Sequence, residues 1–288
     1  MGRLQAVREG ALTLSQEVSA FGRARLAGVR SGAARLQEEI QARPALARAL
    51  AIAASLVTLG ITAWVFWVFD RRFYYWTTGY DEEFFVWGGW SIRKGLAPYR
   101  DFIEFKPPMV FITHAIAQML FGYRHQGYRA FFTIFPLLSL LALQTSLLAR
   151  GVGRLLALAV MLGFIILFVT PTYHDVSLSD AEGIGVSYYL LGLALLLWEG
   201  RYIKVTTVLG GFFMSCCVLS KEPFVFVVVF SWLGLFWLRG RPGPSRESAT
   251  LYARYSLLGV GLLIFVLCVY MVPTGAMRAY LKIDRKSV

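Results

Sequence analysis

Residues 47–69 read ARALAIAASLVTLGITAWVFWVF and carry one charged side chain, Arg48, close to their start. A helix needs about 17–25 such apolar residues to cross the core of a bilayer, and this run is long enough. Six further apolar segments follow it, several of them short for a span. The seven predicted spans are approximately Ala47–Phe69, Ala130–Leu148, Leu155–Thr170, Gly183–Trp198, Ile203–Leu219, Phe224–Leu238 and Leu257–Val272. We therefore predict an all-α polytopic membrane protein with about seven transmembrane helices.

The composition of the 288-residue chain favours the same class. Hydrophobic residues make up 57% of it and charged residues only 16%, whereas soluble domains carry about 25% charged residues. The net charge of +12 could indicate nucleic-acid binding. However, the basic residues lie beside apolar segments, where the positive-inside rule accounts for them. The predicted partner is the lipid bilayer and not a nucleic acid. Cys216, Cys217 and Cys268 lie within apolar runs, which indicates buried thiols and no disulfide framework.

The positions of the basic residues predict the topology. Arg150–Arg154, Arg201–Lys204 and Arg239–Arg254 all become cytoplasmic if there are seven spans and the N-terminus is also cytoplasmic. The loop Asp70–Arg129 then lies on the opposite side. The expected location is the bacterial inner, or plasma, membrane. On this scheme residues 47–288 form the transmembrane domain, with a long first external loop over residues 70–129.

Residues 1–46 form a separate N-terminal segment that is basic and amphipathic. Its apolar residues recur every three or four positions, which places them on one face of a helix. A basic helix of this kind can lie on the anionic cytoplasmic leaflet or stay loose in the cytosol. A short coiled coil or a partner helix is the alternative. The residues that define the apolar face are Leu4, Val7, Ala11, Leu14, Val18 and Phe21.

Two further helices are predicted within the external loop. Met109–Phe121 is apolar, but it is short for a span, and counting it as one would send the downstream basic loops outside. We therefore predict that it lies along the membrane surface, as we do for Glu82–Gly95. Pro107 and Pro108 suit the first turn of such a helix, because a proline there loses no intrahelical hydrogen bond.

In this topology, charged side chains gather on the non-cytoplasmic side of the membrane. Asp81–Glu83 follows the first span, Ser179–Glu182 precedes the fourth, and Ser220–Pro223 joins the fifth and sixth. Arg100 and Lys106 come from the first loop. A carboxylate can act as a general base, a role that contributes roughly 10²–10⁴ in rate. Lysine and arginine can neutralise a phosphate leaving group. Most of the other loop charges, Glu83 and Arg71 among them, are read as ordinary solvated residues.

The sequence of the external loop resembles a known family. Asp81-Glu82, the stretch GLAPYRDF at 95–102, Lys106-Pro107-Pro108 and the short apolar helix ending at Gly122 are similar to the first external loop of type-C glycosyltransferases. The similarity is greatest to the branch with protein O-mannosyltransferases and the lipid A aminoarabinose transferase. Ser179-Asp180-Ala181 resembles the second acidic position of that family, and Ser220–Pro223 its lysine before a later span. The resemblance extends over roughly residues 47–240.

The resemblance implies an inverting membrane glycosyltransferase that moves a sugar from a polyprenyl-phosphate carrier to an acceptor on the non-cytoplasmic face. The acceptor could be a protein, a lipid or a glycan. Asp81 would be the base or would position the acceptor. Asp180 would support the acceptor or the catalytic centre, and Lys106 and Lys221 would bind the carrier phosphate. The implied site residues are catalytic Asp81, Glu82 and Asp180 and substrate-binding Tyr99, Arg100, Glu104, Lys106 and Lys221.

The chain departs from the family in two ways. Some relatives carry Glu directly before the Lys-Pro pair, where this chain has Phe105 and places Glu104 one position earlier. Family members also continue through further spans, whereas this chain stops at Val288, which leaves open a fragment, a minimal core or an inactive remnant. We predict no cofactor. A divalent metal would need His174, Asp175 and distant acids to meet, and their spacing matches no ligand pattern.

The alternative function is a transporter-type protein, or a non-catalytic or truncated membrane protein of the same fold. A transporter predicts charged residues near the middle of its spans. The predicted spans have no charged residue there, and the acids gather at one face. The distribution of charge therefore favours an enzyme.

Overall fold

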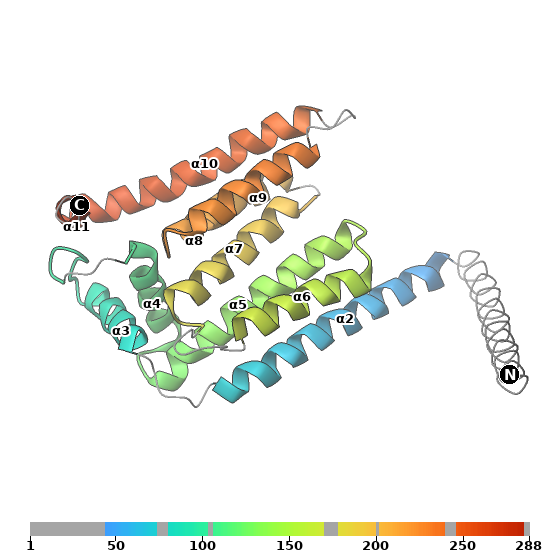
Figure 1. Cartoon of the computed structure of the whole chain (residues 1–288), viewed down its shortest axis with the longest axis horizontal. Helices are drawn as coiled ribbons and strands as arrows, with labels where there is room; N and C mark the ends of the chain where they lie inside the picture. The colour runs from blue at the N-terminus through green and yellow to red at the C-terminus, as the bar shows by residue number, and fades with distance from the viewer. Residues whose placement is uncertain are drawn as a thin grey trace, which may run out of the picture. The chain divides into compact units, whose positions relative to one another are not determined.

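The computed structural model describes residues 44–73, 80–102, 106–169, 178–199, 202–239 and 246–284. Every regular element in these ranges is an α-helix, labelled in Figure 1. In chain order they are α2 (Pro44–Phe73), α3 (Tyr80–Arg93), α4 (Pro108–Phe121), α5 (His125–Ala149), α6 (Arg154–Val169), α7 (Ala181–Leu197), α8 (Ile203–Val218), α9 (Phe224–Arg239), α10 (Arg246–Met271) and α11 (Ala276–Asp284). The chain divides into two compact units, Met1–Val57 and Thr58–Val288. The predicted segment 1–46 lies almost wholly outside the described residues.

The prediction of an all-helical fold is confirmed for the described residues, and the lengths of the helices are consistent with a membrane protein. Each of the seven predicted spans is a helix, and three helices contain stretches long and apolar enough to cross a membrane: Ala45–Arg71, Gln126–Ala149 and Ala249–Met271. The remaining predicted spans, α6 to α9, are shorter apolar helices of 16 or 17 residues. At a rise of about 1.5 Å per residue they extend about 24 Å, somewhat less than the ~30 Å bilayer core.

Within the unit Thr58–Val288, α7 has a central position. It packs against α5 on one side and α8 on the other, and α8 in turn packs against α10. Figure 1 shows these long helices side by side, with α3, α4 and α11 together at one end of them. At the opposite end Arg150, just after α5, pairs with Glu199, just after α7, at 2.7 Å. α5 and α7 therefore end on the same side, and helices that follow one another along the chain run in alternate directions between the two ends.

Glycines allow α8 and α10 to approach closely. A Cβ added to Gly211 would lie 2.1 Å from the carbonyl oxygen of Ser256, and one added to Gly259 would lie 2.0 Å from that of Val208. Both obstructing atoms belong to the backbone, so neither can turn away. Small residues at such crossings are typical of helices that associate within membranes.

We expect Gly259→Ala to destabilise the protein, because the new methyl group collides with the backbone of α8. Overpacking of this kind costs about 1–3 kcal/mol in unfolding free energy. Gly261→Ala is the matched control on the same helix, since a Cβ there meets nothing within 4 Å and helix propensity improves equally in both variants. Thermal unfolding in detergent measures the difference, and equal melting temperatures would contradict the proposed α8–α10 crossing.

The two predicted loop helices form as α3 and α4. The prediction that α4 lies along the membrane surface stays a prediction. The structure adds that most of its residues from Pro108 to Gln118 are buried among α3, α5 and α7. Phe111 is fully buried and contacts Phe85 and Phe102 edge to face, with ring centroids 5.9 and 5.5 Å away. Ile116 and the C-terminal turn of α4, with Met119 and Leu120, are exposed. The helix thus forms part of the core beside the loop that connects it to α3.

Candidate functional site

The connection between α3 and α4 determines the position of Lys106. Tyr99 adopts a left-handed backbone conformation with φ of 67°. Its backbone N–H donates to the Phe102 carbonyl at 2.8 Å, and its hydroxyl donates to the Lys106 carbonyl at 2.7 Å. One turn later, the backbone N–H of Met109 donates to the Leu219 carbonyl at the end of α8, at 3.1 Å. This last hydrogen bond brings the start of α4 beside the loop that holds Lys221.

Four charged side chains from four parts of the chain meet at this end of the molecule. Asp81 lies in the first turn of α3, and its Oδ2 is 3.7 Å from the Nζ of Lys106. Glu182 lies in the first turn of α7 and pairs with Lys221. The charge of Lys106 also acts on the Glu182 carboxylate. We call Asp81, Lys106, Glu182 and Lys221 the charged cluster.

The two ion pairs of the charged cluster differ in exposure. The side chain of Asp81 is 63% exposed, and its contact with Lys106 is loose, so this pair contributes little to stability. Glu182 is less exposed. Burial raises the pKa of its carboxyl group, but hydrogen bonds from Lys221 and from its own backbone N–H, together with the charges of Lys221 and Lys106, outweigh burial and leave the pKa below its usual value. Glu182 is therefore a carboxylate at neutral pH, and Lys106 can exchange its partner for another anion at small cost.

Asp180 is buried at the N-terminal boundary of α7, and its side chain does not cap that helix. The preceding residue is held by α4, because the Nε2 atom of His114 lies 2.9 Å from the Ser179 carbonyl. Burial lowers the pKa of His114 to about 4, although the Ser179 hydrogen bond opposes this change. The imidazole is thus neutral at pH 7, and Nε2 carries the proton that it donates. His114 fixes the loop that leads to Asp180 and Glu182.

The Arg100 side chain forms its hydrogen bonds outside the charged cluster. It donates two hydrogen bonds to the Asp101 carboxylate, at 2.8 and 2.6 Å, and a third to the Thr274 carbonyl at 2.6 Å. Hydrogen bonds from Arg100 and from the backbone N–H of Ala97 lower the pKa of Asp101 to about 2. Arg100 therefore ties the loop to the turn between α10 and α11. The adjacent Tyr99 ring packs on Tyr280 of α11 at 4.8 Å.

Glu82 points away from solvent, unlike its neighbour Asp81. Its side chain is 2% exposed, and its carboxylate lies 3.6 Å from a guanidinium nitrogen of Arg129, which is itself 11% exposed. The Tyr128 hydroxyl donates to the same carboxylate at 3.3 Å. Both partners belong to α5. Glu82 thus joins α3 to α5 in a buried ion pair, and the structure does not bring it into the charged cluster.

The structure thus groups Asp81, Lys106 and Lys221 from the predicted set and adds Glu182, which was not among the predicted site residues. The only sequence signal for Glu182 was its place two residues after Asp180, just inside the helix. Glu104, His174 and Asp175 lie outside the described residues. No group of three or more His, Cys, Asp or Glu side chains within the described ranges could hold a metal ion.

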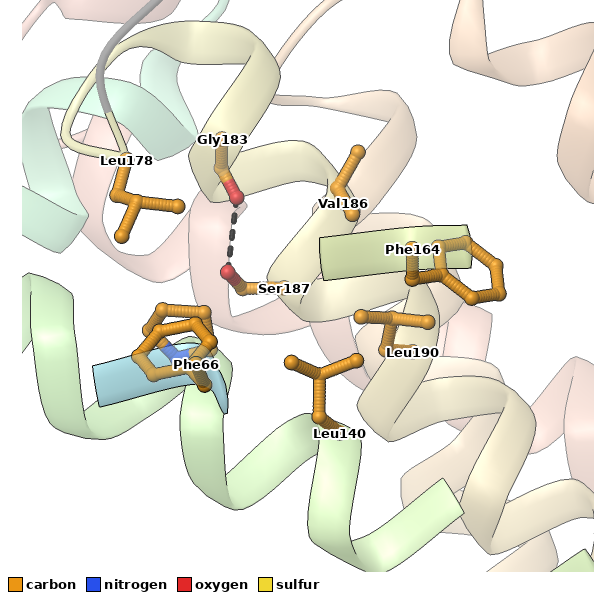
Figure 2. A pocket seen from close by; sticks show the side chains of 9 residues that line it. Phe66, Leu140, Phe164, Leu178, Gly183, Val186, Ser187 and Leu190 are labelled. Atoms are coloured by element: carbon orange, nitrogen blue, oxygen red, sulfur yellow. Dashed lines mark hydrogen bonds between the residues drawn. The ribbon is translucent and has the colours of Figure 1, made fainter. Parts of the chain in front are cut away.

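A separate pocket lies between α2, α5, α6 and α7, as Figure 2 shows. Its lining is almost entirely apolar and includes Phe66, Leu140 and Phe164, and the Ser187 hydroxyl that reaches it already donates to the Gly183 carbonyl at 2.8 Å. The accessible volume is about 20 Å³, enough for about one water molecule. This pocket therefore has room for no ligand larger than about a water molecule, and no charged side chain is among those that line it.

No family model matches this chain, and no curated protein or solved structure matches it either. The resemblance to type-C glycosyltransferases therefore rests on the residues quoted for it.

Proposed function

We propose that this protein is a membrane glycosyltransferase that moves a sugar from a polyprenyl-phosphate carrier to an acceptor. The observation that supports this function most is the charged cluster, in which an exposed carboxylate, Asp81, lies beside Lys106 at the end of a set of apolar helices. Such a site offers a base for the acceptor and cations for the phosphate of the carrier. The quoted resemblance of residues 81–108 adds to this argument.

We further propose that α2 and α5 to α10 are seven spans and that the charged cluster faces away from the cytoplasm. The alternation of the helices supports this topology, because it brings Arg150, Arg154 and Lys204 to one end and the charged cluster to the other. Basic loops of membrane proteins favour the cytoplasmic side. The short helices α6 to α9 then require some local thinning of the bilayer, which costs a fraction of a kcal/mol per ångström.

Cysteine labelling in intact cells tests this topology. We expect Arg124→Cys to react with a membrane-impermeant maleimide from outside the cytoplasm, because the residue is exposed between α4 and α5. Lys204→Cys, exposed at the opposite end, is the matched control and should react only after the cells are opened. Labelling of Arg124→Cys from the cytoplasmic side alone would overturn the assignment of α4 as a helix that does not span.

In the proposed reaction, the acceptor attacks the anomeric carbon in line with the bond to the carrier phosphate, and the configuration inverts. Asp81 orients the acceptor hydroxyl or amine and takes its proton as the new bond forms. The carrier phosphate leaves with the electrons of the broken bond, and Lys106 and Lys221 neutralise its charge. Glu182 holds Lys221 in place, and Tyr99 holds the backbone of Lys106.

Lys106→Ala is expected to weaken binding of polyprenyl phosphate about tenfold or more, because it removes a cation that contacts the phosphate. The binding of a fluorescent short-chain polyprenyl phosphate to the protein in detergent measures this loss. Arg71→Ala is the control: Arg71 is exposed and packs on the Trp67 ring at 4.9 Å, apart from the charged cluster. Equal carrier affinity in the Lys106 variant would remove its proposed role and favour a non-catalytic protein in which the cluster is purely structural.

A further inference from the structure

Helix α11 has the features of a helix that lies at a membrane surface. It follows α10 after a tight turn that ends at Gly275, whose φ of 75° suits glycine. Ala276 is fully buried, and Met277 and Tyr280 pack against the core of the unit. The opposite side of the short helix faces outward. Its position is set by α10, because the stretch Ala249–Met271 is one of the three long enough to cross a bilayer.

The outward side of α11 carries two cations and one leucine. Arg278, Leu281 and Lys282 are all exposed, Leu281 by 56%. Residues three and four positions apart lie next to each other on a helix, so these three side chains form one continuous face. We call them the α11 cationic face.

The α11 cationic face differs from the four basic side chains at this end of the molecule that are paired with a carboxylate. No ion pair joins Arg278 or Lys282 to a side chain that the structure describes. The neutralised pairs are Arg100 with Asp101, Lys106 with Asp81, Arg129 with Glu82, and Lys221 with Glu182.

We propose that the α11 cationic face binds the anionic headgroups of phospholipids in the leaflet that surrounds this end of α10. The end of a spanning helix lies at the level of the headgroups, and α11 begins only a few residues beyond it. Arg278 and Lys282 match the phosphate in charge, and Leu281 beside them can enter the boundary between headgroups and acyl chains, as in other interfacial helices. This inference requires only that α10 crosses the membrane and does not depend on sugar transfer.

An environment-sensitive fluorophore on Leu281→Cys tests the proposal in the full-length protein. The native cysteines are first replaced by serine or alanine, and the protein in neutral detergent is titrated with phosphatidylglycerol or phosphatidylcholine. We expect a blue shift of the emission with phosphatidylglycerol at far lower concentration than with phosphatidylcholine. Because each basic residue near an anionic leaflet changes affinity about fivefold, Arg278→Gln combined with Lys282→Gln should raise the phosphatidylglycerol midpoint about 25-fold.

Lys204→Gln combined with Arg254→Gln is the matched control, since it removes the same charge from the opposite end and should leave the midpoint unchanged. Identical midpoints for the two lipids would overturn the proposal, as would an unchanged midpoint in the Arg278 and Lys282 double variant. A response to inorganic phosphate alone, equal to that with phosphatidylglycerol, would assign the face to a free anion and would also overturn it. Circular dichroism of each variant confirms that the helices remain folded.

Discussion

Asp81→Asn is expected to lower the rate of sugar transfer at least about 100-fold, the lower end of what a general base contributes. Asparagine keeps the shape of the side chain but removes its charge and basicity, so the acceptor loses the group that takes its proton. The fold should tolerate the change, because Asp81 is 63% exposed and its contact with Lys106 is loose. Transfer of a radiolabelled sugar from a polyprenyl phosphate by purified, reconstituted protein measures the rate.

Glu83→Gln is the matched control for this experiment. Glu83 is an exposed carboxylate in the same helical turn as Asp81, and it is not part of the charged cluster. We expect the Glu83 variant to transfer sugar normally and the Asp81 variant to keep its affinity for the carrier. Nearly normal transfer by Asp81→Asn would exclude Asp81 as the base, and Asp180 and Glu182 would then be the carboxylates to replace.

Glu82→Ala is expected to lower the unfolding free energy by about 3 kcal/mol or more. The variant leaves the guanidinium of Arg129 largely buried and without the Glu82 carboxylate, and breaking a buried ion pair in this way costs about 3–5 kcal/mol. Denaturant or thermal unfolding in detergent gives the difference from the wild-type protein. This result would make Glu82 a residue that stabilises the α3–α5 contact, in place of the catalytic role that its sequence position suggested.

Two further variants separate stability from catalysis at Glu82. Glu83→Ala, one residue away but exposed, should change the unfolding free energy by less than about 0.5 kcal/mol. Replacing Glu82 by Ala together with Arg129 by Leu should be less harmful than Glu82→Ala alone, because the guanidinium that lost the Glu82 carboxylate is removed with it. If Glu82→Ala abolished sugar transfer while its unfolding matched that of the wild-type protein, the structural role would be wrong.

The sequence predicted the helices well because each helix depends on residues that are close together in the chain. A run of apolar residues that must satisfy its own backbone hydrogen bonds forms a helix, and all seven runs did so. The environment of α4 was not predictable in the same way. Its composition, apolar with few polar groups, suits a membrane surface and a protein core equally well. The burial of Phe111 and His114 depends on how α3, α5 and α7 pack against α4, and the composition of α4 alone does not determine that packing.

Part of the candidate site was predictable, because a charged residue at the end of an apolar segment is a sign of a functional position. Asp81, Lys106 and Lys221 met that condition, and the structure brings them together around Glu182. The choice between adjacent acids was not predictable, because consecutive residues on a helix point about 100° apart. Glu82 faces Arg129 on α5, which no local pattern in the sequence identifies.

The contacts of Arg100 and Tyr99 have a consequence for the biosynthesis of the protein. The Arg100 guanidinium bonds to the carbonyl of Thr274, 174 residues later in the chain, and Tyr99 packs on Tyr280. A ribosome that adds about 5–20 residues per second needs roughly 10–35 seconds to make the intervening sequence. Throughout this time the loop that orients Lys106 lacks its anchor. The nascent chain can therefore insert its first helices while the charged cluster is still incomplete, and the site is assembled only when α11 arrives.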